Sequence, residues 1–168
     1  MPSVSILIVE EDASIARELA KHLEGLGYRI VGVVHSSQDA LQMIEPFKPS
    51  IILMNVRLKG RLEGIKTGNL IHQRHDLPVI YVIDQSSQAT IRRAAATSPF
   101  GYIFRPFDQK QVLATIETAL IRHQLEKKLQ QSRQWLNTTL TSIADGVLAT
   151  DEQGRIRFMN PAAMRLTG

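Results

Sequence analysis

Short apolar runs alternate with amphipathic segments along most of the chain. The runs show no polar alternation, so they predict strands that are buried on both faces, at residues 6–9, 30–34, 51–54, 79–83 and 102–104. The segments between them carry apolar residues at helical spacing and predict helices at residues 14–26, 37–44, 65–74 and 88–97. Pro46 and Pro49 are expected to break the second helix. The alternation predicts an α/β fold with a five-stranded parallel sheet, doubly wound by helices.

A much longer helix is predicted next, because no glycine or proline occurs from about residue 109 to residue 143. Four apolar residues of this segment fall on one stripe: Leu125, Leu129, Leu136 and Ile143. Ser132 and Thr139 take the alternating positions, so the apolar seam is imperfect. The stripe predicts a parallel homodimer through a short coiled coil. The alternative is a single helix that packs on its own domain.

The pattern changes after Asp145-Gly146. Two short strand candidates at 147–150 and 155–159 flank a turn with Gly154, which predicts a β-hairpin. Asn160-Pro161 then opens a short helix at residues 162–166. A hairpin with one short helix cannot bury a core of its own. The expected divisions are a first domain at 1–121, a helical linker at 122–143 and a partial α+β segment at 144–168.

Composition narrows the function classes. The 168 residues include no cysteine, which excludes disulfides and thiolate metal sites. No apolar run approaches the roughly 20 residues of a membrane helix, and the N-terminus lacks the features of a signal peptide. The expected compartment is therefore the cytoplasm. The net charge is +4, but the basic residues are dispersed and no nucleic-acid-binding motif accompanies them, so neither nucleic acid nor membrane is an expected partner.

The candidate chemistry lies where the predicted strands end, because doubly wound sheets place their functional crevice there. A carboxylate at position 55 could form an acyl phosphate, acidic neighbours could hold Mg²⁺, and a hydroxyl and a cation on the next strands could bind phosphoryl oxygens. The chain supplies the acids Glu10 and Glu11 and the cation Arg105. It supplies neither the carboxylate nor the hydroxyl, because Asn55 and Ile83 fill those places.

Four stretches together resemble the receiver domain of two-component response regulators: ILIVEED at 6–12, IILMNVRL at 51–58, PVIYVI at 78–83 and FGYIFRPF at 100–107. The resemblance covers about residues 1–121 and implies the flavodoxin-like receiver fold. It also implies roles for individual positions. The acidic pair falls on Glu10 and Glu11, the phosphoacceptor on Asn55, the Thr/Ser position on Ile83, the lysine position on Arg105 and the switch aromatic on Tyr102.

Four of these positions depart from the family pattern. Asn55 cannot form the acyl phosphate, because an amide is not an anionic oxygen nucleophile. Ile83 has no hydroxyl, Arg105 replaces a lysine, and Glu11 replaces an aspartate. We therefore expect a pseudo-receiver that is not phosphorylated. Glu10 and Glu11 are expected to bind Mg²⁺ weakly if at all, and no other cofactor is predicted. Arg105 is expected to pair with Glu10 or Glu11, the alternative being a solvent-facing side chain.

The C-terminal stretches 140–147, 151–156 and 158–163 resemble the start of a PAS sensor domain, truncated here because a whole one needs about a hundred residues. A receiver, a helical linker and a PAS segment in this order resemble the N-terminal part of hybrid sensor histidine kinases. We expect a non-enzymatic module that acts by protein–protein contact with a histidine kinase or a downstream signalling domain. One alternative is a working Mg²⁺-dependent phospho-receiver with an engineered Asp-to-Asn change. Another is a DNA-binding transcriptional regulator, which would need a helix-turn-helix after residue 121 that the sequence lacks.

Overall fold

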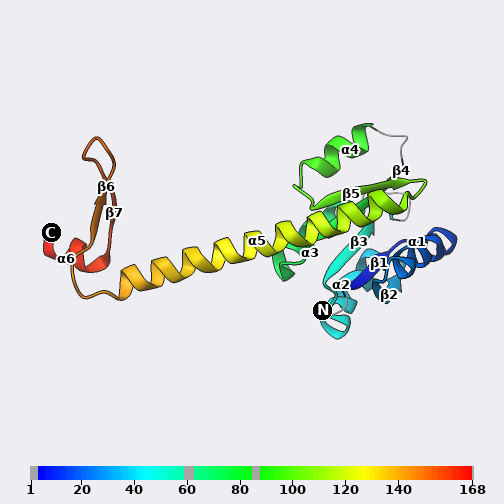
Figure 1. Ribbon diagram of the computed structural model, residues 1–168, viewed down its shortest axis with the longest axis horizontal. Coiled ribbons are helices and arrows are strands. Elements are labelled where there is room, and N and C mark those ends of the chain that lie inside the picture. The colour runs from blue at the N-terminus through cyan, green and yellow to red at the C-terminus, as the bar shows by residue number, and fades with distance from the viewer. Residues whose placement is uncertain (1–3, 59–62, 85–87, 168) are drawn as a thin grey trace. The chain divides into compact units, whose positions relative to one another are not determined.

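The computed structural model describes residues 4–58, 63–84 and 88–167 (Figure 1). The chain divides into two compact units, Met1–His123 and Gln124–Gly168. The helix α5 (Gln109–Ser142) belongs in part to each. Among the described residues, no helix is both long enough and apolar enough to cross a membrane.

The first unit is built on the five-stranded parallel sheet that the apolar runs predict, with strand order β2-β1-β3-β4-β5 (Figure 1). The strands are β1 (Ser5–Val9), β2 (Arg29–Val34), β3 (Ile51–Asn55), β4 (Val79–Asp84) and β5 (Gly101–Arg105). Every residue of β1 and the first four residues of β3 are buried. This burial explains why these strands read as continuous apolar runs in the sequence.

Helices cover both faces of the sheet, as the doubly wound prediction requires. They are α1 (Ala13–Gly25), α2 (Ser37–Phe47), α3 (Glu63–His75), α4 (Gln88–Ala95) and the first part of α5. The two buried leucines of α1 and the buried residues of α5 share one apolar cluster with Ile8 and Leu53. The buried aliphatic residues of α2, α3 and α4 share the other with Met54 and Ile83. Alternate residues of a strand therefore pack in different clusters.

The prediction that Pro46 breaks the second helix is wrong, since Pro46 lies inside α2. The helix begins after its N-cap, Ser36, whose hydroxyl accepts the Asp39 N–H at 3.1 Å. It ends at Lys48, which is left-handed with φ 45° and donates its N–H to the Ile44 carbonyl at 2.8 Å. Pro46 is tolerated because it sits in the last turn, where its missing N–H costs one hydrogen bond.

Two glycines bring α3 close to the sheet. A Cβ atom on Gly64 would overlap the backbone carbonyl oxygen of Asn55. A Cβ atom on Gly68 would lie 2.7 Å from the hydroxyl of Tyr81 on β4. The start of α3 is thus set directly against the strand end that carries Asn55.

Polar and aromatic contacts fix the first part of α5 on the first unit. The Tyr28 hydroxyl donates to Glu117 Oε1 at 2.7 Å. His123 Nε2 lies 3.3 Å from Asp76 Oδ1, and its ring meets Phe100 edge-on at 5.6 Å between centroids. The Arg122 guanidinium lies 4.8 Å from the centroid of the same Phe100 ring. These contacts hold α5 on the first unit as far as His123.

The second unit contains the predicted hairpin and short helix. Strands β6 (Leu148–Thr150) and β7 (Ile156–Met159) pair antiparallel, and α6 (Pro161–Thr167) follows. Its buried residues, among those described, are Asn160, Ala162 and Ala163. In α5, every residue from 124 to 138 is exposed. The apolar core of the second unit is therefore very small.

Candidate functional site

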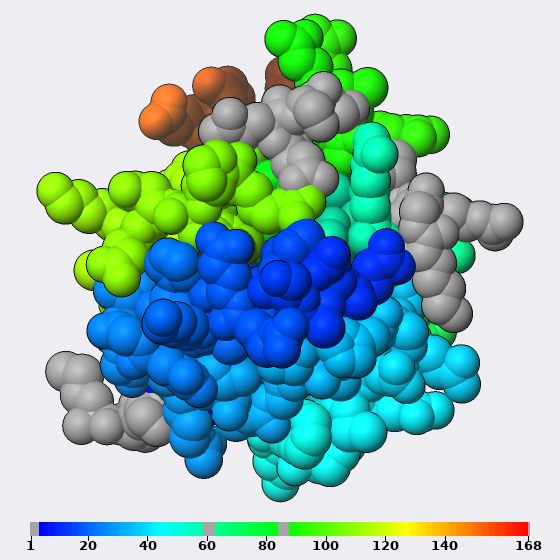
Figure 2. Space-filling model, turned by 90° about the vertical axis from the view of Figure 1, so that its right-hand side faces the viewer, coloured from blue at the N-terminus to red at the C-terminus, as the bar shows by residue number. Residues whose placement is uncertain are grey.

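The predicted site residues converge at one edge of the sheet. Glu10 directly follows β1, Asn55 ends β3, and Arg105 ends β5. Ile83 is the penultimate residue of β4 and pairs with Phe104 in the parallel register. Figure 2 views the first unit from the side on which the strands of Figure 1 end, with α1 in blue beside the start of α5 in yellow-green.

Glu10 and Asn55 form the centre of this site. Glu10 is only 2% exposed, and its Oε2 accepts a hydrogen bond from Asn55 Nδ2 at 2.7 Å. Its Oε1 accepts the backbone N–H of Asp12 at 3.0 Å. Burial raises the pKa of Glu10 above its ordinary value, and the two hydrogen bonds and the charge of Arg105 oppose that rise only in part. Both carboxylate oxygens thus have a donor from the protein.

Both the nitrogen and the oxygen of the Asn55 side-chain amide form hydrogen bonds. Its Nδ2 donates to Glu10, and its Oδ1 accepts the backbone N–H of Arg57 at 2.9 Å. An aspartate in this conformation would place a second anionic oxygen against the buried Glu10 carboxylate. The neutral amide instead supplies the donor that a buried carboxylate needs.

The acidic neighbours of Glu10 are placed differently. Glu11 is exposed on the same edge. Asp12 is the N-cap of α1, and its Oδ1 accepts the N–H groups of Ser14 at 2.8 Å and Ile15 at 3.1 Å. These two hydrogen bonds lower the pKa of Asp12. Sequence reasoning missed this cap, although an aspartate just before a predicted helix is the usual signal for one.

Ile83 and Arg105 occupy the positions where a phosphoryl group would need a hydroxyl and a lysine. Ile83 is 1% exposed and packs in the apolar cluster between the sheet and α2, α3 and α4. Arg105 is half-buried. Its positive charge opposes the rise that burial causes in the pKa of Glu10, and it adds to the hydrogen bonds from Ile15 and Ser14 that lower the pKa of Asp12. Its direct pairing with Glu10 or Glu11 stays a prediction.

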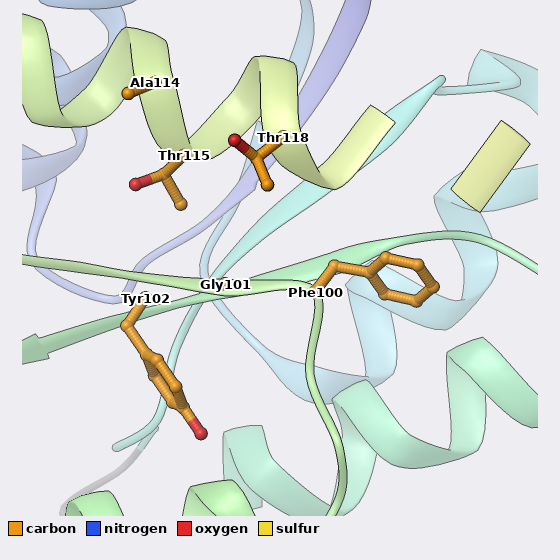
Figure 3. A pocket seen from close by; sticks show the side chains of 6 residues that line it. All are labelled: Phe100, Gly101, Tyr102, Ala114, Thr115 and Thr118. Carbon is orange, nitrogen blue, oxygen red and sulfur yellow. The ribbon is translucent and has the colours of Figure 1, made fainter. Parts of the chain in front are cut away.

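Tyr102, the predicted switch aromatic, is half-buried in β5 and stacks on Phe104, with 6.4 Å between ring centroids. Burial raises the pKa of its hydroxyl. Tyr102 also lines a hollow between β5 and α5, together with Phe100, Gly101, Ala114, Thr115 and Thr118 (Figure 3). Its ring points away from the two threonines of α5 and packs with the cluster that contains Ile83. A switch role for Tyr102 stays a prediction.

The residues at this edge do not fit a magnesium site as they are arranged. Both oxygens of Glu10 accept hydrogen bonds, and Asn55 turns its amide nitrogen, which cannot ligate a cation, toward Glu10. Across the described ranges, no group of three His, Cys, Asp or Glu side chains could hold a metal ion. Mg²⁺ prefers several oxygen ligands in near-octahedral geometry.

The predicted helix stripe is open to solvent. Leu125, Leu129 and Leu136 are 61%, 54% and 48% exposed, and Ile143 is 36% exposed. Trp135, which the sequence pattern did not single out, is 67% exposed beside Leu136. The described residues therefore leave much of this apolar surface in contact with solvent.

Comparison with known protein families gives two matches along the chain. The response regulator receiver domain matches residues 6–117, and a PAS domain matches residues 134–168. The first match covers most of the first unit, including every predicted pocket residue. The second begins within α5 and continues through the hairpin and α6.

Individual relatives agree with the first match. The transcriptional regulatory protein PdtaR of Mycobacterium tuberculosis is 29% identical over 168 positions, which cover 95% of this chain and 82% of that protein. A protein-glutamate methylesterase/protein-glutamine glutaminase of Paramagnetospirillum magneticum is 29% identical over 90% of this chain and 45% of its own length. The chain thus spans about half the length of some relatives. The receiver domain of a modulated diguanylate cyclase from Desulfovibrio desulfuricans G20 superposes with a TM-score of 0.67 at 31% identity, over 73% of this chain and 97% of that one.

Proposed function

The chain belongs to the response regulator receiver family, and from that premise we propose that it is a receiver-like module of two-component signalling that is not phosphorylated. We propose that it acts by protein–protein contact with a histidine kinase or a downstream signalling domain. Its relatives support a place in two-component signalling. The finer claim, that the phosphoryl chemistry is lost, depends on the pocket.

One observation carries the proposal: the amide of Asn55 is built into the pocket through both of its ends. It donates to buried Glu10 and accepts from the Arg57 backbone. Phosphorylation of a receiver needs an anionic carboxylate oxygen that attacks phosphorus, and an amide offers none. The hydrogen bond to Glu10 supports a permanent structural role for Asn55, one that needs no metal between the two side chains.

The neighbouring positions support the same conclusion. A phosphoryl group would need donors at the ends of β4 and β5 to bind its oxygens. Ile83 offers a buried aliphatic side chain instead. Arg105 keeps a positive charge, but its planar guanidinium differs in shape and hydrogen bonding from the ammonium of a lysine. We propose that Arg105 stabilises the buried Glu10 carboxylate, because its charge opposes the rise in the pKa of Glu10 that burial causes.

We further propose that the chain forms a parallel homodimer through the exposed part of α5. A helix with no tertiary packing is only marginally stable in water, and residues 124–138 are all exposed. Leu125, Leu129 and Leu136, with Ser132 between them, follow the alternating spacing of three and four residues of a coiled-coil seam. A second copy in register would cover these leucines. Neither DNA binding nor an enzymatic activity of these residues is part of the proposal.

Intact-mass spectrometry after incubation with acetyl phosphate and Mg²⁺ tests the central claim. We expect no gain in mass for the native chain. The positive control is the triple variant Asn55→Asp, Ile83→Thr, Arg105→Lys, which restores the carboxylate, the hydroxyl and the lysine and should gain one base-labile phosphate. A base-labile phosphate on the native chain would overturn the proposal. The single variant Asn55→Asp restores the carboxylate but neither the hydroxyl nor the lysine. It therefore shows whether the acceptor alone is enough for phosphorylation.

A further inference from the structure

The join between α5 and the β6–β7 hairpin is held by one buried side chain. Asn160 lies between β7 and α6 and is 0% exposed. Its Nδ2 donates to the carbonyl oxygens of Asp145 at 2.8 Å and Leu140 at 3.1 Å, and lies 3.4 Å from that of Ile143. The last carbonyls of a helix have no partner within the helix, so the Asn160 amide closes the end of α5.

The other end of the same amide binds the elements that follow. Asn160 Oδ1 accepts the N–H of Val147, just before β6, at 2.9 Å, and the N–H of Ala163 in α6 at 2.8 Å. The second bond makes Asn160 the N-cap of α6, and the Asn160 backbone N–H donates to the Val147 carbonyl at 3.0 Å. One side chain therefore joins the end of α5, the start of the hairpin and the start of α6.

Apolar packing cannot replace this join. The buried apolar side chains described in the second unit are those of Ala162 and Ala163, while Leu148, Ile156, Met164 and Leu166 are exposed. Only a side chain with both a two-hydrogen donor and an acceptor at this length can satisfy the partners on both sides. Aspartate has the same shape but would turn an oxygen toward the carbonyls of α5. Serine would keep an N-cap acceptor for α6 and lose the donors toward α5.

We propose that Asn160 is a positioning residue that sets the direction of the hairpin and α6 relative to the end of α5. A rotation or shift of α5 is then passed to the PAS-like segment through the amide rather than lost in the connection at 143–147. The positioning role of Asn160 does not depend on the proposed signalling function. The use of Asn160 as a signal relay rests on that proposed function.

Distances between spin labels test the geometric role. The chain has no cysteine, so cysteines introduced at exposed Gln134 and Glu152 would carry the only labels. This pair reports α5 against the hairpin, and a second pair at Glu152 and Arg165 reports the hairpin against α6. Labelled protein is diluted with unlabelled protein, so that only distances within one chain are read. Asn137→Asp, at an exposed position of α5, is the matched control for Asn160→Asp.

We expect narrow distance distributions for both pairs in the native chain and in Asn137→Asp. Asn160→Ser should broaden the α5–hairpin distribution roughly twofold or more and leave the hairpin–α6 pair narrow. Asn160→Asp should broaden the α5–hairpin pair further. If Asn160→Ser leaves both pairs narrow, or broadens both equally, Asn160 does not position the hairpin and the proposal fails. Neither label pair involves Asn55, so this result and the phosphorylation test fail independently.

Discussion

Each unit of this chain contains an asparagine whose side-chain amide forms hydrogen bonds at both ends, half-buried Asn55 in the first unit and fully buried Asn160 in the second, but the two units depend on it differently. Asn55 joins Glu10 to the Arg57 backbone beside two large apolar clusters that cover both faces of a sheet. Asn160 joins three elements where the buried apolar residues described are two alanines. In the first unit, Asn55 adds hydrogen bonds to a fold that is already stabilised by large buried apolar clusters. In the second unit, the hydrogen bonds of Asn160 hold the elements together where little apolar surface is buried.

The largest expected difference between the units is in local stability. We expect backbone amides of residues 147–163 to exchange with solvent roughly a thousandfold faster than those of β1 and β3, because local opening is cheap where few apolar contacts are buried. Hydrogen–deuterium exchange followed by mass spectrometry of peptides from the two units measures this. Equal protection in both units would show that the Asn160 network stabilises its unit as well as a core does.

A second test is the replacement of Asn55 in the first unit by aspartate, which should have a smaller effect on stability. Asn55→Asp places a second carboxylate beside Glu10, and we expect a loss of about 2 kcal/mol in the free energy of unfolding at neutral pH without metal. Urea titration measures the loss. Asn55→Ala removes the hydrogen bonds without adding a charge and is the matched control. Added Mg²⁺ should restore stability to Asn55→Asp but not to Asn55→Ala; equal responses would contradict a charge-based cost.

The stretch of α5 between the two amides gives a third test. Leu129→Ala keeps a strong helix former but removes an apolar side chain from the stripe of each copy. Leu129 is 54% exposed in one chain, so covering it in the dimer contributes about 1 kcal/mol per copy, and the loss of both leucines should give a roughly 30-fold weaker dimer. Sedimentation equilibrium measures the dissociation constant. Gln134→Ala, on the opposite side of the helix, should leave it unchanged. A monomeric native chain, or equal effects of the two variants, would contradict the coiled-coil proposal.

Burial on both faces made the sheet of the first unit predictable from its continuous apolar runs. The positions of Asn55, Ile83 and Arg105 at one edge followed from the parallel topology alone. What adjacent residues do at that edge was not predictable: Glu10 is buried and Glu11 exposed, although the two have the same side chain. The Asn160 network was missed because its partners are all backbone groups, among them those of Leu140, Asp145 and Val147, which leave no pattern in a sequence.

The smallest expected effect concerns the charge of Glu10. Its pKa is raised in the folded protein from an ordinary value of 4.5, so above that pH the folded state binds more protons than the unfolded state. The stabilising contribution is complete below pH 4.5 and is lost as the pH rises through the raised pKa. Hydrogen bonds from Asp12 and Asn55 oppose burial, which keeps the effect small.

Urea titrations of the native chain and of Glu10→Gln, at pH values from below 4.5 upward, isolate the contribution of Glu10 to the free energy of unfolding, since glutamine does not titrate. We expect the stability of the native chain relative to Glu10→Gln to fall as pH rises, with Glu11→Gln as the exposed matched control. A difference that rises with pH would mean that the amide of Asn55 and the charge of Arg105 outweigh burial. Asn55 and Arg105 would then stabilise the ionised pocket together, and the contrast with Asn160, whose partners are all uncharged backbone groups, would rest on charge rather than on core size.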